Sequence, residues 1–318
     1  MRRLIALTAA PALLLAAAAR AEVPAVVTDI PAVQSLAAQV MGDLGAPAIL
    51  LERGGNAHGY QMKPSQARAL QDADLIFWVG PEMTPWLKRA VEGASPNGKA
   101  IALLHTEGTL RRTFGAGAEG QTQEREEHVP QNRDDEHHRD DEHDHGGTDP
   151  HAWLDPANAQ AWLGVIAAEL AAADPENAAA YSANAAAAAR RIAALDAQIA
   201  AELAPVKDRP FVVVHDAYGY FADHYGLTIA GTVSPGDAAE PGAERLSGIR
   251  RLLEEAAAVC VFPEAQHDPR QIAALVDGTP VRLGRALDPE GSSLPFGPEL
   301  YPALLTGLAT TIADCLAG

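Results

Sequence analysis

Histidines and carboxylates concentrate in one stretch of the sequence, residues 124–156, which holds six of the eleven histidines. Imidazole is the commonest metal ligand and carboxylates are acceptable partners, so this composition indicates metal binding. Between Glu124 and His145 there are ten acids and three arginines, a formal charge of −7. Such a segment buries too little apolar surface to offset its ordering entropy, so we expect a mobile loop. It is either a solvated acidic linker or a collector of metal ions through His128, His137, His138, His143 and His145.

Three histidines, one of them within residues 124–156, lie where a parallel α/β sheet binds its ligands. His58 follows a predicted strand over residues 47–51, His215 ends another over 211–215, and His151 lies just ahead of a helix capped by Asp155. Because loops and helix N-termini converge beyond the carboxyl ends of parallel strands, these imidazoles can meet around one cation. Three nitrogens leave one position of a tetrahedral zinc shell for an oxygen ligand.

Two other histidines also lie at or after the ends of predicted strands. His105 ends a predicted strand and His267 lies in a loop after one, so geometry alone admits both. A single histidine of this kind is more often hydrogen-bonded at the surface than bound to metal. His224, inside a predicted helix, is interpreted as structural.

Short apolar strands alternate with amphipathic helices in both halves of the chain. The strands are predicted over 25–28, 47–51, 73–79, 99–104, 211–215, 227–233, 258–262 and 280–283. This βαβα alternation predicts an α/β fold with parallel sheets and helices on their faces. Asp174 followed by Pro175 predicts the start of a helix that runs to Leu203, about 43 Å long, which could brace two domains together.

Length and charge limit the classes of protein that the chain can belong to. Its 318 residues suffice for two domains of ordinary size. Residues 1–21 combine a basic start, an apolar run and an Ala-x-Ala site, which predicts a secretory signal cleaved after Ala21 rather than a membrane anchor. Its removal leaves 21 basic residues against 42 acids. The resulting charge of −21 repels nucleic acid and anionic lipid and attracts cations.

Export also bears on the two cysteines, Cys260 and Cys315. In an oxidising compartment an isolated pair is more plausibly a disulfide than a metal or redox site, with two buried free thiols as the alternative. The pair would tie the last helix to a strand.

Several segments carry a family resemblance, and they follow one another in matching order over nearly the whole mature chain. They are the Gly-rich loop 54–60 with Pro64 and Ser65, residues 70–83, Pro150 to Pro156 (PHAWLDP), residues 215–221, 241–245, 260–262 and 287–289. In these segments the chain resembles the metal-binding lipoprotein/adhesin-type solute-binding proteins of ABC transporters, and most of all their zinc-uptake branch. The charged, His-rich loop and the predicted disulfide also fit that branch.

The resemblance implies two Rossmann-like lobes, with the metal between them, joined by a long rigid helix. We therefore expect a signal peptide (1–21), an N-terminal lobe (22–123), the mobile loop (124–149), the end of the N-terminal lobe (150–173), the linking helix (174–205) and a C-terminal lobe (206–318).

By position, the resemblance makes His58, His151 and His215 the metal ligands. Manganese-binding relatives have a carboxylate where this chain has His215, and a third nitrogen suits Zn²⁺ better than Mn²⁺. Some zinc-binding relatives place a glutamate directly before the first histidine, where this chain has Ala57. The fourth ligand is then water, which we favour, or Asp288, which could instead hold a ligand histidine from outside the metal shell.

The function implied is capture of Zn²⁺ in the periplasm without catalysis. The expected partner is the inner-membrane permease of a zinc transporter, with periplasmic zinc chaperones as further candidates, and the protein is expected to be monomeric. A secreted zinc hydrolase is a second hypothesis, because three histidines and a water also make a catalytic shell. However, the sequence has no H-E-x-x-H motif and no nucleophile motif. A third hypothesis is a zinc buffer or adhesin that uses the His-rich loop alone.

Overall fold

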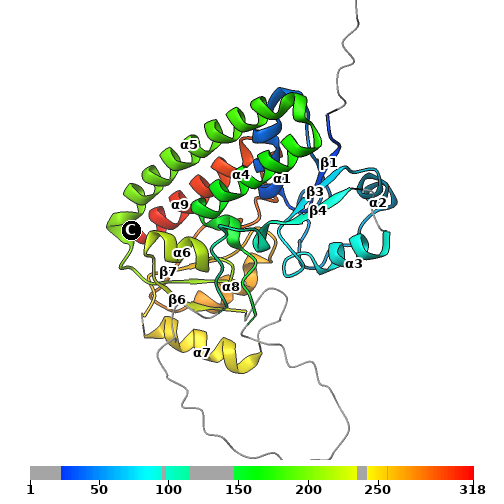
Figure 1. Ribbon diagram of the computed structural model, residues 1–318. Helices are drawn as coiled ribbons and strands as arrows, with labels where there is room; N and C mark the ends of the chain where they lie inside the picture. Colours follow the sequence, from blue (N-terminus) through cyan, green and yellow to red (C-terminus); the bar gives the residue numbers. More distant parts are fainter. Residues whose placement is uncertain (1–22, 95–97, 115–146, 235–241, 256) are drawn as a thin grey trace, which may run out of the picture.

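Two four-stranded parallel sheets form the framework of the computed structural model (Figure 1), which describes residues 23–94, 98–114, 147–234, 242–255 and 257–318. The first sheet has the order β2-β1-β3-β4, and the second has the order β6-β5-β7-β8. The two orders are the same pattern, so the lobes share one topology. The strands are β1 (Val26–Thr28), β2 (Ala48–Ile49), β3 (Leu75–Trp78), β4 (Lys99–Ala102), β5 (Phe211–Val213), β6 (Ile229–Thr232), β7 (Cys260–Phe262) and β8 (Arg282–Leu283). The predicted α/β class and parallel pairing are confirmed.

Helices cover the sheets and connect the lobes. They are α1 (Pro31–Met41), α2 (Pro64–Gln71), α3 (Pro85–Ala94), α4 (Pro156–Ala173), α5 (Ala178–Leu203), α6 (Gly219–Tyr225), α7 (Ala243–Glu254), α8 (Pro269–Val276) and α9 (Leu300–Ala317). Asp155 caps α4 as predicted, because its carboxylate accepts the Ala157 N–H at 2.8 Å. Capping matters here because α4 follows directly on the segment that carries His151.

The predicted start of the long helix is wrong by three residues. Pro175–Asn177 forms a 3₁₀ turn, η4, and α5 begins only at Ala178. The Asp174 side chain does not cap the backbone of this turn; it accepts hydrogen bonds from the Asn177 side chain and the Tyr181 hydroxyl. The remaining 26 residues of α5 still extend about 39 Å.

One apolar core runs through both lobes. It includes Ile30 and Phe77 of the first lobe, Phe262 of the second, Tyr181 of α5 and Leu305 of α9. Helix α5 packs against α4, α1 and α9, and Figure 1 shows these helices side by side along one flank of both lobes. Because a close-packed interior transmits displacement rather than absorbing it, this core couples the lobes.

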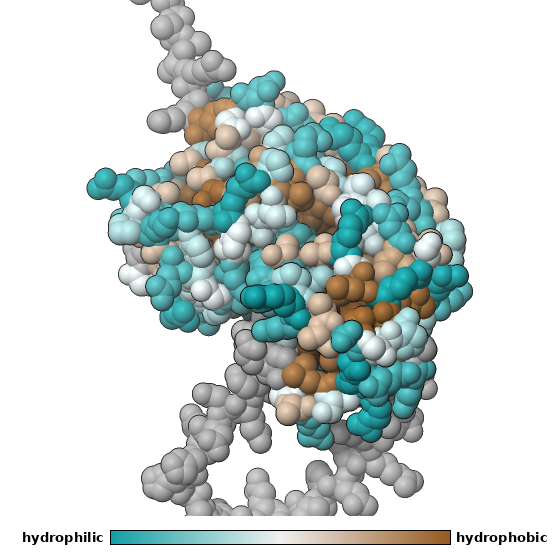
Figure 2. All heavy atoms as spheres, turned by 180° about the vertical axis from the view of Figure 1, so that it is seen from behind, coloured by the Kyte–Doolittle hydropathy of each residue, from teal (hydrophilic) through white to brown (hydrophobic). Residues whose placement is uncertain are grey.

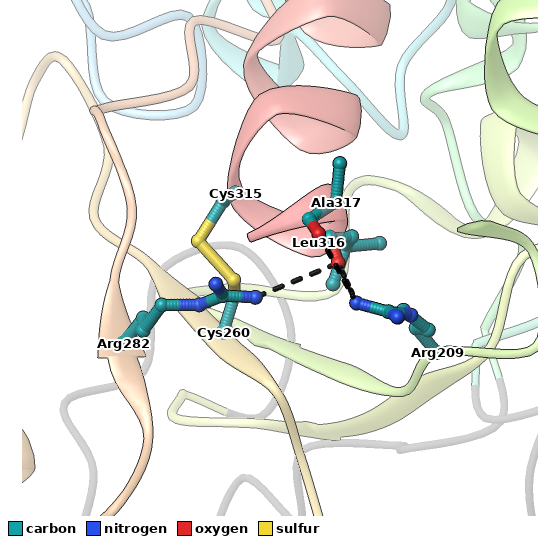
Figure 3. The surroundings of a disulfide bond; sticks show 6 residues. All are labelled: Arg209, Cys260, Arg282, Cys315, Leu316 and Ala317. Atoms are coloured by element: carbon teal, nitrogen blue, oxygen red, sulfur yellow. Dashed lines mark hydrogen bonds between the residues drawn. A yellow bond between two sulfur atoms is a disulfide. The ribbon is translucent and has the colours of Figure 1, made fainter. Parts of the chain in front are cut away.

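The disulfide between Cys260 and Cys315 ties the end of α9 to β7 (Figure 3). Arg209 and Arg282 both donate to the carbonyl of Leu316 next to it. Carbonyl groups at the end of α9, which have no hydrogen-bond partner within the helix, therefore accept from positively charged side chains.

Among the described residues, one helix is long and apolar enough to cross a membrane by length and composition, α9, of which 44% is buried inside the protein. The face in Figure 2 is mostly polar, with apolar side chains gathered toward its lower right. Large apolar side chains exposed on the described surface are Leu110, Leu246 and Leu283.

Candidate metal centre

Three histidines from three separate loops come together in the structure. His58 follows β2, His215 lies two residues beyond the end of β5, and His151 directly precedes the short 3₁₀ helix η3 (Ala152–Leu154). One ligand nitrogen from each can be chosen so that all lie within 4.8 Å of one another. The ring centroids are 5.4 Å apart for His151 and His215, 5.6 Å for His58 and His151, and 6.4 Å for His58 and His215.

His58 sits in a loop that is held by hydrogen bonds at the histidine and at the residue before it. Its backbone N–H donates to the Asn56 side chain at 2.8 Å. The carbonyl of the preceding residue, Ala57, accepts the Trp86 indole N–H at 2.6 Å. The pKa of His58 lies well below its ordinary value because of burial and the neighbouring imidazoles of His151 and His215. A lowered pKa keeps the ring neutral, which is the form that binds a metal.

His151 is fully buried and held by Asp149. One oxygen of that carboxylate lies 2.9 Å from Nδ1 of His151 and accepts its backbone N–H at 3.0 Å. Because an ionised carboxylate can only accept, Nδ1 carries the proton and Nε2 is left as the donor for a metal.

Arg112 anchors Asp149 in turn. Its guanidinium donates to Asp149 and to Asp223, each at 3.0 Å. It also lies so close to Gly219 of α6 that a Cβ at this glycine would overlap it. Arg112 thereby connects the His151 segment to a helix of the second lobe.

His215 is held in the same way by Glu264, which follows β7. Nδ1 of His215 lies 2.7 Å from each carboxylate oxygen. The Tyr218 hydroxyl donates to the same carboxylate at 3.0 Å, and His267 lies 3.2 Å from it. Burial by itself would raise the pKa of Glu264, but His215 and His267 lower it to about 2. A carboxylate beside an imidazole fixes the ring and raises its basicity, as at known zinc sites.

His105 and His224 lie away from this cluster, whereas His267 contacts it through Glu264. His105 pairs with Glu82 at 2.9 Å and is exposed. His224 lies between Asp155 and Asp196, at 3.0 and 2.9 Å, in agreement with its predicted structural role. The five histidines predicted as auxiliary ligands, and the signal peptide, lie outside the described residues.

Asp288, the candidate oxygen ligand, is engaged within its own loop. Its carboxylate accepts the Ser292 N–H at 3.1 Å, the Ser293 N–H at 2.9 Å and the Ser293 hydroxyl at 2.5 Å. A different acid of this loop, Glu290, is buried, and burial raises its pKa to about 8.

The sequence reasoning missed Asp149, Glu264, Arg112 and Glu290. A signal for Glu264 existed: it follows β7, the strand paired with β5, so it had to emerge beside His215.

This arrangement suits a small divalent cation. Zinc binds imidazole nitrogens at about 2.0–2.1 Å in a tetrahedral shell. Three nitrogens that are already near one another need to move only a short distance to reach one ion.

Comparisons with known proteins agree on the class. A family model described as the periplasmic component A of the zinc-uptake complex matches residues 26–315. The chain is 54% identical to the high-affinity zinc uptake system protein ZnuA of Paracoccus denitrificans over 304 residues, which cover 94% of this chain and 93% of that one. It is 36% identical to the ZnuA of Brucella suis, with 92% and 91% of the two chains covered. Among solved structures, a ZnuA deletion mutant with zinc bound has a TM-score of 0.72 at 25% identity and covers 92% of this chain and 98% of its own.

Proposed function

Because the chain belongs to the family of periplasmic zinc-uptake components, whose members are solute-binding proteins, we propose that it captures Zn²⁺ in the periplasm and delivers it to an inner-membrane permease. The observation that carries this proposal is the convergence of three imidazoles from both lobes, with ligand atoms within 4.8 Å of one another. Zn²⁺ is cargo here, held by His58, His151 and His215 and later released.

Two buried carboxylates support capture rather than weak surface binding. Asp149 and Glu264 hold His151 and His215 in one orientation before the ion arrives. Pre-organised ligands lose little conformational freedom when the ion binds, so their affinity for the ion is higher. The two buried acids also place negative charge near the bound ion, which favours a divalent cation.

The test is zinc affinity measured by competition with a chelator. His151→Ala and His215→Ala each remove a ligand, so we expect zinc binding to weaken at least a hundredfold. His105→Ala is the matched control, since His105 is exposed and outside the cluster, and its affinity should match wild type. Wild-type affinity in both ligand variants would contradict the proposal.

A further inference from the structure

The loop that follows β8 meets both of the first-lobe loops that carry histidines. Its Ser292 carbonyl accepts the Gly54 N–H at 3.1 Å, and its Ser293 carbonyl accepts from Arg53 at 2.9 Å. On the other side, the Pro289 carbonyl accepts the Trp153 indole N–H at 2.8 Å. The segment 288–293 is thus attached to the His58 loop and to η3, which follows His151.

Glu290 lies in the middle of this attached segment. Its neighbour Gly291 has a φ of 70°, a left-handed conformation that turns the chain back toward Asp288. Glu290 itself is 5% exposed, and it interacts electrostatically with His151 and with the backbone N–H of Ala57, the residue before His58. The Glu290 side chain therefore lies near His151 and near the backbone of the residue that precedes His58.

One oxygen of Glu290, Oε2, is buried and has no hydrogen-bond partner among the described residues. Buried polar atoms without a partner are rare in folded proteins because the lost hydration is not replaced. The other two buried carboxylates of the site, Asp149 and Glu264, are each hydrogen-bonded to a histidine Nδ1. Glu290 is the buried acid here whose free oxygen a cation could satisfy.

On the premise that the three histidines bind Zn²⁺ as proposed above, we propose that Glu290 supplies the fourth ligand, a carboxylate oxygen, rather than water or Asp288. Asp288 is already committed to three hydrogen bonds inside the loop. The Glu290 carboxylate lies outside the group of ligand atoms within 4.8 Å of one another, so it moves inward when the ion binds. Its charge then offsets part of the ion's charge in a buried site.

Glu290→Gln tests this assignment, because it keeps the shape of the side chain and removes the anionic oxygen. The zinc dissociation constant should rise at least about tenfold, the lower end of the loss seen when partners outside a metal shell are removed. The visible spectrum of the Co²⁺-loaded protein should also change, because one ligand is replaced. Glu299→Gln, the same substitution at an exposed position nearby, should change neither.

Each outcome is decisive. Zinc affinity within threefold of wild type, or an unchanged Co²⁺ spectrum, overturns the assignment of Glu290 as a ligand. A wild-type protein that binds no zinc at its histidines refutes the proposed function instead, which separates the two failures. If Glu290→Gln does not fold, Glu290→Asp keeps the charge but shortens the reach, and it should alter the Co²⁺ spectrum as well.

Discussion

A carboxylate behind an imidazole recurs at this site, with Asp149 behind His151 and Glu264 behind His215. In each pair the acid accepts from Nδ1, so Nε2 carries the lone pair that can bind a metal. Both acids are nearly or fully buried. The ring orientations are therefore set by the fold and not by the ion.

Glu264→Gln should weaken zinc binding about 10- to 100-fold, because the amide still accepts from Nδ1 but no longer places a negative charge beside the ligand ring. Chelator competition measures the effect. Glu254→Gln on α7 is the control, since Glu254 forms an exposed pair with Arg250. An affinity within twofold of wild type in Glu264→Gln would show that this carboxylate does not support the metal site.

The three histidines were predictable from sequence, whereas of the acids behind them only Glu264 had a signal, its position after the strand β7. His215 comes directly after an apolar run and His58 lies in the Gly-rich loop that follows another, so their position at the sheet edge follows from the strand pattern. Asp149 is anchored by Arg112, which is 37 residues away, and Glu290 lies in a segment that Trp153 contacts at Pro289, 136 residues away. Local patterns contain no information about such pairs.

Helix α6 is joined to α4 and α5 by His224. Its ring lies between Asp155, which caps α4, and Asp196 of α5. The hydrogen bond to Asp155, and then that to Asp196, raise the pKa of His224 to about 9. The ring is thus a cation at neutral pH and holds three helices together.

This raised pKa predicts a pH dependence of stability. Below about pH 6.5, the ordinary value, His224 is protonated in both the folded and the unfolded chain, so its full stabilisation is present. As the pH rises from there through about 9, the unfolded chain binds fewer protons than the folded one, so this stabilisation is lost. Urea unfolding at pH 6, 7.5 and 9 should show a decline that is smaller in His224→Gln. An identical pH profile in the variant would contradict the role of the ion pairs.

The disulfide makes a separate contribution at the end of α9. It closes a segment with a sequence separation of 55 residues. By the chain-entropy relation, such a loop constrains the unfolded state by about 4 kcal/mol. The variant Cys260→Ala/Cys315→Ala should lose stability of this order in urea unfolding, while its zinc affinity stays unchanged. Equal stability of the variant and wild type would show that α9 is held by packing alone.

Element boundaries were predicted well where a proline and a cap coincide, as at Asp155 and Pro156. The same pair of signals failed at Asp174, whose carboxylate accepts from the side chains of Asn177 and Tyr181 instead of capping the turn. This arrangement depends on tertiary packing around Tyr181, which is fully buried. The domain limits placed at 173/174 and 205/206 stay predictions.

At the scale of the whole molecule, the lobes share a core and not only a connecting helix. Residues of both sheets, α5 and α9 belong to the same apolar cluster. Opening the lobes widely would expose this surface to water, at a cost of about 25 cal/mol for each Å². We therefore infer that release of the ion proceeds through small displacements of the site loops.

The central claim is that one Zn²⁺ is held by three imidazoles from both lobes. The most direct measurement is anomalous scattering at the zinc edge in crystals of the exported protein loaded with one equivalent of zinc. The account predicts a single strong peak about 2.0–2.1 Å from a nitrogen of each of His58, His151 and His215. A peak bound only by histidines of the 128–145 segment, or none at the three-histidine cluster, would contradict it.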